Sequence, residues 1–252
     1  MKLDVAFLPY LLYNPEESAC VMIDVLRAST SIVTLIAQGA TDITLASGPG
    51  RARHLASLAP GKYLLCGEVG GLPPSGFDYG NSPSEFAAMD LKGQRVILYT
   101  TNGTRALQGM AQSPLVLVGA LVNAAAAVRT LLAEAEARRL DAALVCAGLE
   151  HGKRLSLEDV FVAGALVDRA VEAAPGRASL ELTDDADMAR HVYRSYRGDA
   201  RTAFRQSEHG RSLIALGLGH DLDFCAQTDR FDAVPRLRRE QTGRLTLAVE
   251  KV

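Results

Sequence analysis

Short runs of apolar and β-branched residues recur along the chain, and segments of helical periodicity separate many of them. The runs that predict buried strands are Leu3–Leu8, Cys20–Val25, Asp42–Ala46, Lys62–Cys66, Arg95–Thr100, Leu115–Val118, Ala142–Cys146 and Leu245–Val249. The segments that predict helices are Ser29–Gln38, Gly50–Leu58, Gly103–Gln112, Asn123–Arg139 and Ser156–Ala173. This alternation predicts an α/β fold built from βαβ units, with a largely parallel or mixed sheet and helices on both of its faces.

The segment 183–219 has a different, polar and helical character. Its arginines recur at spacings of three and four residues, which predicts one helical stripe: Arg190, Arg194, Arg197, Arg201 and Arg205. We interpret this stripe as a solvated or ion-paired face rather than a ligand site. Because the chain has no Gly/Ser-rich linker, we expect a single domain over 1–252, with 183–219 as a helical subregion that is a candidate interface or lid.

Composition narrows the classes of protein that need to be considered. Lys and Arg total 27 and Asp and Glu total 29, so the net charge is −2, without the basic excess of a general nucleic-acid binder. No stretch reaches the ~18 apolar residues of a membrane span. The four cysteines are far apart, which argues against a disulfide scaffold or a zinc knot and predicts a reduced, cytoplasmic location.

The carboxyl ends of the predicted strands carry the candidate chemistry, because ligands of open α/β sheets bind there. Asp24 ends one apolar run, where a carboxylate is costly unless it meets a cation or hydrogen-bond donors. We expect Asp24 to bind a metal or act as a nucleophile, with Arg27 binding an anion. The alternative is a structural Asp24–Arg27 ion pair. Ser29 or Thr30 is expected to cap the next helix.

The turn from Thr100 to Thr104 is the candidate phosphate site. It joins a predicted strand to a predicted helix, whose free amides favour an anion. Gly103 would let a phosphate approach the backbone, and we expect Thr101, Thr104 and Arg105 to add hydrogen-bond donors. The alternative is plain helix capping by Thr101 or Asn102.

Further carboxylates stand in similar positions. Glu68 ends another buried run and is a candidate ligand for a divalent cation, unless it simply pairs with a basic neighbour. Glu158 and Asp159 are candidates to complete a carboxylate cluster with Asp24 and Glu68. The alternative for Asp159 is a capping box with Ser156.

The Gly- and Pro-rich loop 69–83 has the length and composition of a binding loop. Asp78 and Asn81 are its candidate ligand contacts. Ser82 and Glu85 predict a capping box with proline at the first helical position. The histidines lack the spacing of a zinc site.

Several blocks of this sequence, in this order, resemble the 2-phosphosulfolactate phosphatase family. The blocks are IDVLRAST, GFDYGNSPSEF, TTNGTRAL, CAG with SLEDVFVAGAL, SEHG with LGLG, and DLDFCAQTD, which together run from Asp24 to Asp229. The segment LEHGKRLS departs from the family pattern by its extra basic residues, and we expect Lys153 and Arg154 to neutralise an anionic substrate.

The resemblance implies a three-layer α/β/α fold and a Mg²⁺-dependent phosphatase that converts 2-phospho-3-sulfolactate to 3-sulfolactate and phosphate, a step of coenzyme M biosynthesis in some organisms. It places the site within the shared blocks, at Asp24, Arg27, Glu68, Asn81, Thr100–Thr104, Glu158 and Asp159. The expected partner is a small phosphorylated anion, with no nucleic acid and no membrane; a homo-oligomer is compatible with the sequence.

Two other functions and two chemical routes stay open at this point. The protein could be a non-catalytic anion-binding or regulatory protein, or a metal-dependent hydrolase of another phosphoester. In an enzyme, a carboxylate either accepts a proton from a Mg²⁺-activated water or attacks phosphorus to form an acyl phosphate.

Overall fold

The central feature of the computed structural model, which describes residues 1–173 and 180–249, is one ten-stranded sheet. Its strand order is β4-β5-β3-β10-β9-β6-β2-β7-β1-β8. The strands are β1 (Lys2–Ala6), β2 (Ser18–Ile23), β3 (Asp42–Leu45), β4 (Leu64–Gly67), β5 (Arg95–Tyr99), β6 (Leu115–Val118), β7 (Asp141–Cys146), β8 (Glu181–Leu182), β9 (Arg236–Arg239) and β10 (Leu245–Ala248). Every apolar run that predicted a strand forms one, with ends shifted by a few residues.

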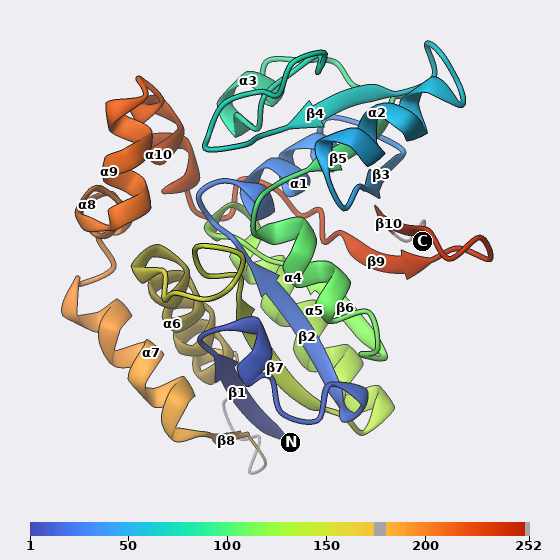
Figure 1. The fold of residues 1–252 in the computed structure, drawn as a ribbon. Coiled ribbons are helices and arrows are strands. Elements are labelled where there is room, and N and C mark those ends of the chain that lie inside the picture. The colour runs from blue at the N-terminus through green and yellow to red at the C-terminus, as the bar shows by residue number, and fades with distance from the viewer. Residues whose placement is uncertain (174–179, 250–252) are drawn as a thin grey trace.

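The sheet consists of two parallel groups that run in opposite directions. Strands β4, β5 and β3 are parallel to one another, as are β6, β2, β7, β1 and β8. The β9–β10 hairpin lies between the groups and pairs antiparallel with both (Figure 1). Three successive antiparallel pairings reverse the direction from β3 to β6, so the sheet is mixed. The loops after β2 and β4 nevertheless reach one common site, described below.

Helices pack against this sheet and give the expected three-layer α/β/α fold (Figure 1). They are α1 (Ala28–Ala37), α2 (Pro49–Ser57), α3 (Pro83–Phe86), α4 (Gly103–Gly109), α5 (Ala124–Arg138), α6 (Leu157–Glu172), α7 (Asp184–Ser195), α8 (Ala200–Gln206), α9 (Glu208–Ala215) and α10 (Gly219–Cys225). The helices that the periodicity predicted all form. No helix in the described ranges is both long and apolar enough to cross a bilayer. All four cysteines are buried and free of disulfides.

The region 183–219 is helical as predicted, but its arginines do not share one stripe. Arg197 lies in the turn between α7 and α8 with a φ of 52°, so the helical axis changes there. Arg190 and Arg194 both contact Asp168, at 2.8 and 2.7 Å, and Arg205 contacts Asp223 at 3.3 Å. Burial alone would raise the pKa of Asp168, yet its two arginines hold that pKa below its usual value. The ion-paired interpretation is therefore confirmed, while the single stripe is wrong.

Helices α6 and α7 approach each other closely at Gly164, which gives a testable result for stability. A Cβ at this position would stand 2.0 Å from the carbonyl oxygen of Ala189 in α7. We expect Gly164→Ala to lower the free energy of unfolding by about 2 kcal/mol or more, because backbone atoms cannot move aside as a flexible side chain would. Denaturant unfolding measures this loss. In the control Gly109→Ala, the new Cβ meets nothing within 4 Å. Equal midpoints for the two variants would contradict the close approach of α6 and α7.

Candidate active site

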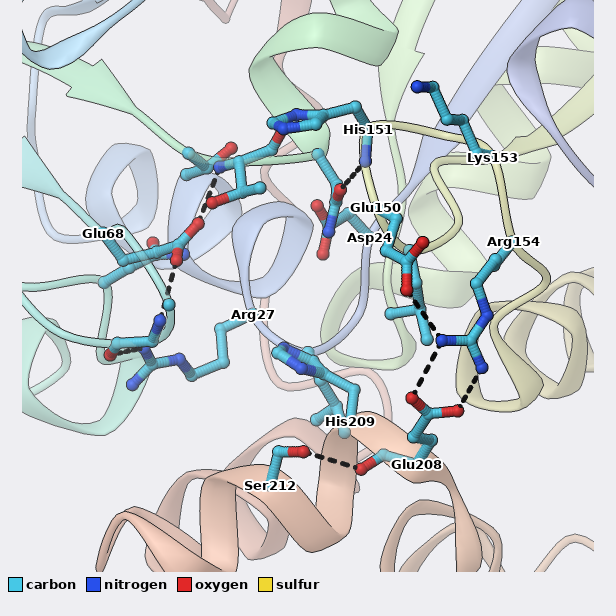
Figure 2. A pocket seen from close by; sticks show the side chains of 18 residues that line it. Asp24, Arg27, Glu68, Glu150, His151, Lys153, Arg154, Glu208, His209 and Ser212 are labelled. Atoms are coloured by element: carbon cyan, nitrogen blue, oxygen red, sulfur yellow. Dashed lines mark hydrogen bonds and ion pairs between the residues drawn. The ribbon is translucent and has the colours of Figure 1, made fainter.

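A cavity of about 540 Å³ lies between loops that follow strands of both parallel groups and the C-terminal helix α9. Its walls come from the loops after β2, β4, β5 and β7 and from α9 (Figure 2). The charged and imidazole side chains that line it are Asp24, Arg27, Glu68, Glu150, His151, Lys153, Arg154, Glu208 and His209. The cavity therefore brings together acidic and basic groups that are far apart in the sequence.

Asp24 follows β2 and is almost fully buried at the cavity. It accepts hydrogen bonds from the backbone N–H groups of Ala28 and Gly103. A Cβ at Gly103 would lie 2.8 Å from its Oδ2, so this close approach requires a glycine. Burial, followed by the charge of Glu68, raises the pKa of Asp24 to about 7. Asp24 can therefore change its protonation state near neutral pH, as a group that exchanges a proton with substrate or water must.

Arg27 is buried and pairs with Asp221, not with Asp24. Its Nη1 lies 2.9 Å from Asp221 Oδ2, and its Nη2 donates to the Gly71 carbonyl at 2.6 Å. The other oxygen of Asp221 accepts hydrogen bonds from Ser82 at 2.7 Å and Ser84 at 2.6 Å. These contacts fix the guanidinium at the cavity wall.

The sequence reasoning missed Asp221, which has no solvent exposure. Because it lies in α10, far from any strand end, nothing in the local pattern distinguishes it from a solvated helical carboxylate. Its neighbours Leu222 and Phe224 are buried, which is the one local hint of an inward-facing helix.

Glu68 follows β4 and is half-buried at the cavity, opposite Arg154 in Figure 2. Its Oε1 accepts from the Thr101 N–H at 2.6 Å, and its Oε2 accepts from the Gly71 N–H at 2.9 Å. Within the described residues, no Lys, Arg or His forms an ion pair with Glu68. The carboxylate is thus held by backbone amides and not by a basic neighbour.

Only part of the predicted phosphate turn after β5 reaches the cavity. Thr100, Thr101 and Asn102 line the cavity, whereas Gly103 and Thr104 are buried behind it. The Thr101 and Gly103 amides bind Glu68 and Asp24, and the Thr104 amide donates to the Thr100 hydroxyl at 3.0 Å. Asn102 makes no side-chain cap to α4; its Oδ1 accepts from the His151 N–H instead. The amides of this turn therefore position the two acidic side chains.

Glu158 and Asp159 lie in the first turn of α6, behind the cavity. Ser156 caps this helix, as predicted, and accepts the Asp159 N–H at 3.3 Å. The Asp159 carboxylate accepts the amides of Val25 at 2.9 Å and Gly148 at 3.3 Å, and so ties the end of β2 to the end of β7. Burial, followed by the charge of Asp24, raises its pKa well above the ordinary value.

Glu158 differs from Asp159 in the hydrogen bonding of its carboxylate. Its Oε2 is buried without a hydrogen-bond partner, and its charge contributes to the raised pKa of Asp24. The charge of Asp24 interacts with those of Glu68, Glu158 and Asp159, but only Asp24 and Glu68 lie on the cavity wall, so the four do not form the single metal-binding cluster that the sequence predicted. Among residues 1–173 and 180–249, no three acidic, His or Cys side chains form a ready metal cluster.

The remaining predicted contacts fall into two classes. Asn81 lines the cavity, and its buried Oδ1 has no hydrogen-bond partner, whereas Asp78 binds the Leu65 amide away from the cavity. Ser82 caps α3, as predicted. The predicted cap of α1 is wrong, because Arg27 occupies the cap position.

Ser29 and Thr30 lie inside α1 and bind the turn that precedes it. Ser29 Oγ accepts the Asp24 N–H at 3.3 Å, and the Thr30 hydroxyl donates to the Val25 carbonyl at 2.9 Å. These two side chains thus help to hold Asp24 in place, although they do not cap the helix.

The rim of the cavity carries both acidic and basic side chains. Arg154 pairs with Glu150 at 2.7 Å and with Glu208 of α9 at 2.6 Å (Figure 2). Lys153 stands apart from these pairs, and within the described residues it has no acidic partner. His209, on α9, completes the wall. The sequence reasoning missed this contribution of α9, which lies in the polar segment 183–219.

Comparison with known proteins shows the family of this chain. The 2-phosphosulpholactate phosphatase family model matches residues 10–240. A relative from Carboxydothermus hydrogenoformans is 37% identical over 98% of this chain and 97% of the relative. A relative from Deinococcus radiodurans is 38% identical over 94% and 93%. Both are named probable 2-phosphosulfolactate phosphatase. This chain therefore belongs to the 2-phosphosulfolactate phosphatase family of phosphoric monoester hydrolases.

Proposed function

We propose that this protein hydrolyses 2-phospho-3-sulfolactate to 3-sulfolactate and phosphate with the help of Mg²⁺. The observation that carries the proposal is that Asp24, Glu68 and a buried Arg27 line one cavity in a member of this family. In organisms that make coenzyme M, this reaction would serve that synthesis, and we expect it to take place in the cytoplasm.

The charges of the cavity suit such a substrate, which carries a phosphate, a carboxylate and a sulfonate. Arg27 presents a fixed guanidinium at the wall, and a guanidinium matches the geometry of oxyanions. Lys153 adds a second positive charge at the rim, where no described residue neutralises it. Arg154 contributes less, because Glu150 and Glu208 already balance it.

The residues present fit a Mg²⁺ ion. Mg²⁺ is usually bound by one or two carboxylates, together with substrate phosphate and water, so a ready cluster of three acidic groups is not required. Asp24 and Glu68 would hold the ion, and the unpartnered Oδ1 of Asn81 is a third oxygen at the same wall. Both oxygens of Asp159 are engaged by amides, so we leave this residue out of the proposed set. When bound, Mg²⁺ would neutralise phosphate charge and lower the pKa of a water.

Two residues act on the reacting phosphate in this proposal. Arg27, held by Asp221, stabilises the negative charge that develops on the phosphate oxygens. In the metal-free protein the pKa of Asp24 is raised to about 7, which suits a group that accepts a proton from the attacking water. In the alternative route Asp24 itself attacks phosphorus. Hydrolysis of a substrate made chiral at phosphorus decides between them: inversion of configuration supports direct attack by water, and net retention supports an aspartyl phosphate on Asp24 and overturns the water route.

Substrate class is the direct test of the function. Phosphate release should be fastest from 2-phospho-3-sulfolactate, slower from phospholactate, which lacks the sulfonate, and slowest from nucleotides. A preference for nucleotides would favour a hydrolase of another phosphoester. No release from any of them would favour a non-catalytic anion-binding protein.

Metal removal should abolish turnover, and Mg²⁺ should restore it. A ligand that binds only the folded state stabilises it, so saturating Mg²⁺ should also raise the unfolding temperature of the chelator-treated protein. At a Mg²⁺ concentration one hundred times the dissociation constant, the free energy of unfolding should increase by about 2.7 kcal/mol. The matched control is the variant with both Asp24→Asn and Glu68→Gln, in which the shift should vanish. An equal shift in this variant would place the ion elsewhere.

The profile of kcat/KM against pH should have an acidic limb that reflects the ionisation of Asp24. We expect kcat/KM to rise as the pH rises through about 7, because ionised Asp24 is required. Metal and proton compete for this carboxylate, so more Mg²⁺ should move the limb to lower pH. A limb that stays in place would assign Asp24 to proton transfer without metal binding.

A further inference from the structure

A second cavity, of about 830 Å³, adjoins the catalytic one. The turn Thr100–Asn102 and the residues His151 and Lys153 line both cavities. The second cavity extends from this common wall towards Tyr10 and Arg105, neither of which lines the first. It therefore lies beside the reacting groups without containing Asp24 or Glu68.

The two cavities differ sharply in charge. Four acidic side chains, Asp24, Glu68, Glu150 and Glu208, line the catalytic cavity together with the cations Arg27, Lys153 and Arg154. No acidic side chain of the described residues lines the second, although Arg105 and Lys153 do. Neither of these cations forms an ion pair or hydrogen bond with another described side chain. The second cavity is thus a concave surface with uncompensated positive charge.

Its neutral groups add to this character. Hydroxyls of Tyr10, Ser47 and Thr101 line the same cavity and can donate hydrogen bonds to an anion. Tyr10 is 71% exposed and stands at the cavity rather than in the core.

Hydrogen bonds hold the wall that separates the two cavities in place. The His151 N–H donates to Asn102 Oδ1 at 2.9 Å, and the ring Nδ1 of His151 lies 3.1 Å from the Thr101 carbonyl. On its catalytic side, the Thr101 N–H binds Glu68 at 2.6 Å. One short turn therefore contacts a catalytic acid on one side and the basic cavity on the other.

We propose that this second cavity binds an oxyanion, in contact with Arg105 and Lys153. Charge-assisted hydrogen bonds from a guanidinium and an ammonium favour a phosphate, sulfonate or carboxylate group over any neutral or cationic ligand. This group is either a free anion, such as released phosphate, or the far end of a substrate whose phosphate lies in the catalytic cavity. Binding of a free anion goes beyond the hydrolysis and does not require it, whereas binding of the far end of the substrate rests on the proposed function.

Direct location uses selenate, whose selenium scatters anomalously. Crystals of the intact chain soaked in selenate should show a peak between Arg105 and Lys153, separate from any peak at Arg27. Crystals of Arg105→Gln should lack that peak alone. No peak beside Arg105 in the wild-type protein would overturn the proposal.

Calorimetry with orthophosphate tests the same site in solution, whether or not the protein is an active enzyme. Arg105→Gln should weaken binding at the second site about ten-fold or more, and Arg129→Gln provides a control at another exposed arginine that lines neither cavity. Equal binding by both variants would contradict the proposal.

Kinetics of Arg105→Gln then identify the source of the anion. An unchanged KM for 2-phospho-3-sulfolactate, with weaker orthophosphate binding, supports a free anion. A raised KM with unchanged kcat supports the far end of the substrate.

Discussion

The Asp24→Asn variant is expected to lose phosphatase activity by roughly 10³-fold or more, the scale of loss when a central catalytic group is removed. Asn keeps the shape of the side chain and an oxygen for the amides of Ala28 or Gly103, but it neither accepts a proton nor carries the charge that holds a metal. Initial rates of phosphate release with saturating Mg²⁺ measure the effect. Asp232→Asn, the same change at an exposed position, should retain full activity.

The same variant should be no less stable than the wild-type protein, which separates a catalytic role from a structural one. In the metal-free protein, the pKa of Asp24 in the folded state, about 7, lies above its ordinary value of 3.8. The folded state therefore binds this proton more tightly than the unfolded state. The resulting stability is fully present below about pH 4 and is lost as the pH rises through about 7.

Thermal unfolding in a chelator therefore gives a clear expectation. The amide introduced by Asp24→Asn is uncharged at every pH, so the variant should gain stability relative to the wild-type protein at about pH 8, and this gain should shrink at about pH 5. An inactive variant that is also strongly destabilised at both pH values would instead indicate that Asp24 mainly maintains the fold.

Replacing Arg27 by Ala should damage both stability and activity. Because Asp221 has no exposure, the substitution leaves a buried carboxylate that keeps only its hydrogen bonds from Ser82 and Ser84 and a 3.7 Å contact with His220 among the described residues. Removing one partner of a buried ion pair costs about 3–5 kcal/mol. Loss of the guanidinium at the phosphate should also lower kcat by roughly 10²–10³-fold. Denaturant unfolding and steady-state kinetics measure the two effects separately.

A double variant separates the contribution of the Arg27–Asp221 pair to stability from the role of Arg27 in catalysis. Arg27→Met with Asp221→Asn removes both charges, so much of the lost stability should return, while the rate should stay low. Recovery of the rate together with the stability would assign the pair to the fold alone. Arg27→Lys is a milder comparison, which keeps the charge but loses the two-pronged contact with Asp221 and Gly71.

The strands and helices could be predicted from the sequence because the patterns that indicate them are local. Strand β2 is buried along its whole length, so it appears as an uninterrupted apolar run. Strand β9 was missed because three of its four residues are arginines, and it forms only through pairing with β10 and β6. No local pattern shows that a hairpin from the C-terminal end of the chain separates the two parallel groups.

The candidate site was readable to the extent that its members are polar residues at the ends of apolar strands. Asp24, Glu68 and Thr101 satisfy this rule, and they line one cavity. Asp159 was selected from the loop and helix start that follow β7, yet its oxygens bind the amides of Val25 and Gly148. Sequence position thus identifies carboxylates near a site, but it does not separate those that face the cavity from those that hold the strands.

By itself, the sequence determined the α/β alternation, the set of strand-end acids and the family, since each depends on residue types within a short window. Tertiary structure alone decided that Arg27 pairs with Asp221, 194 positions away, and that α9 closes the rim of the catalytic cavity. It also decided that acidic and basic residues together line one side of the Thr101 turn, whereas no acidic residue of the described chain lines the cavity on the other. The physical reason is that periodicity and capping act between near neighbours, whereas burial of charge depends on which distant segments the packed sheet brings into contact.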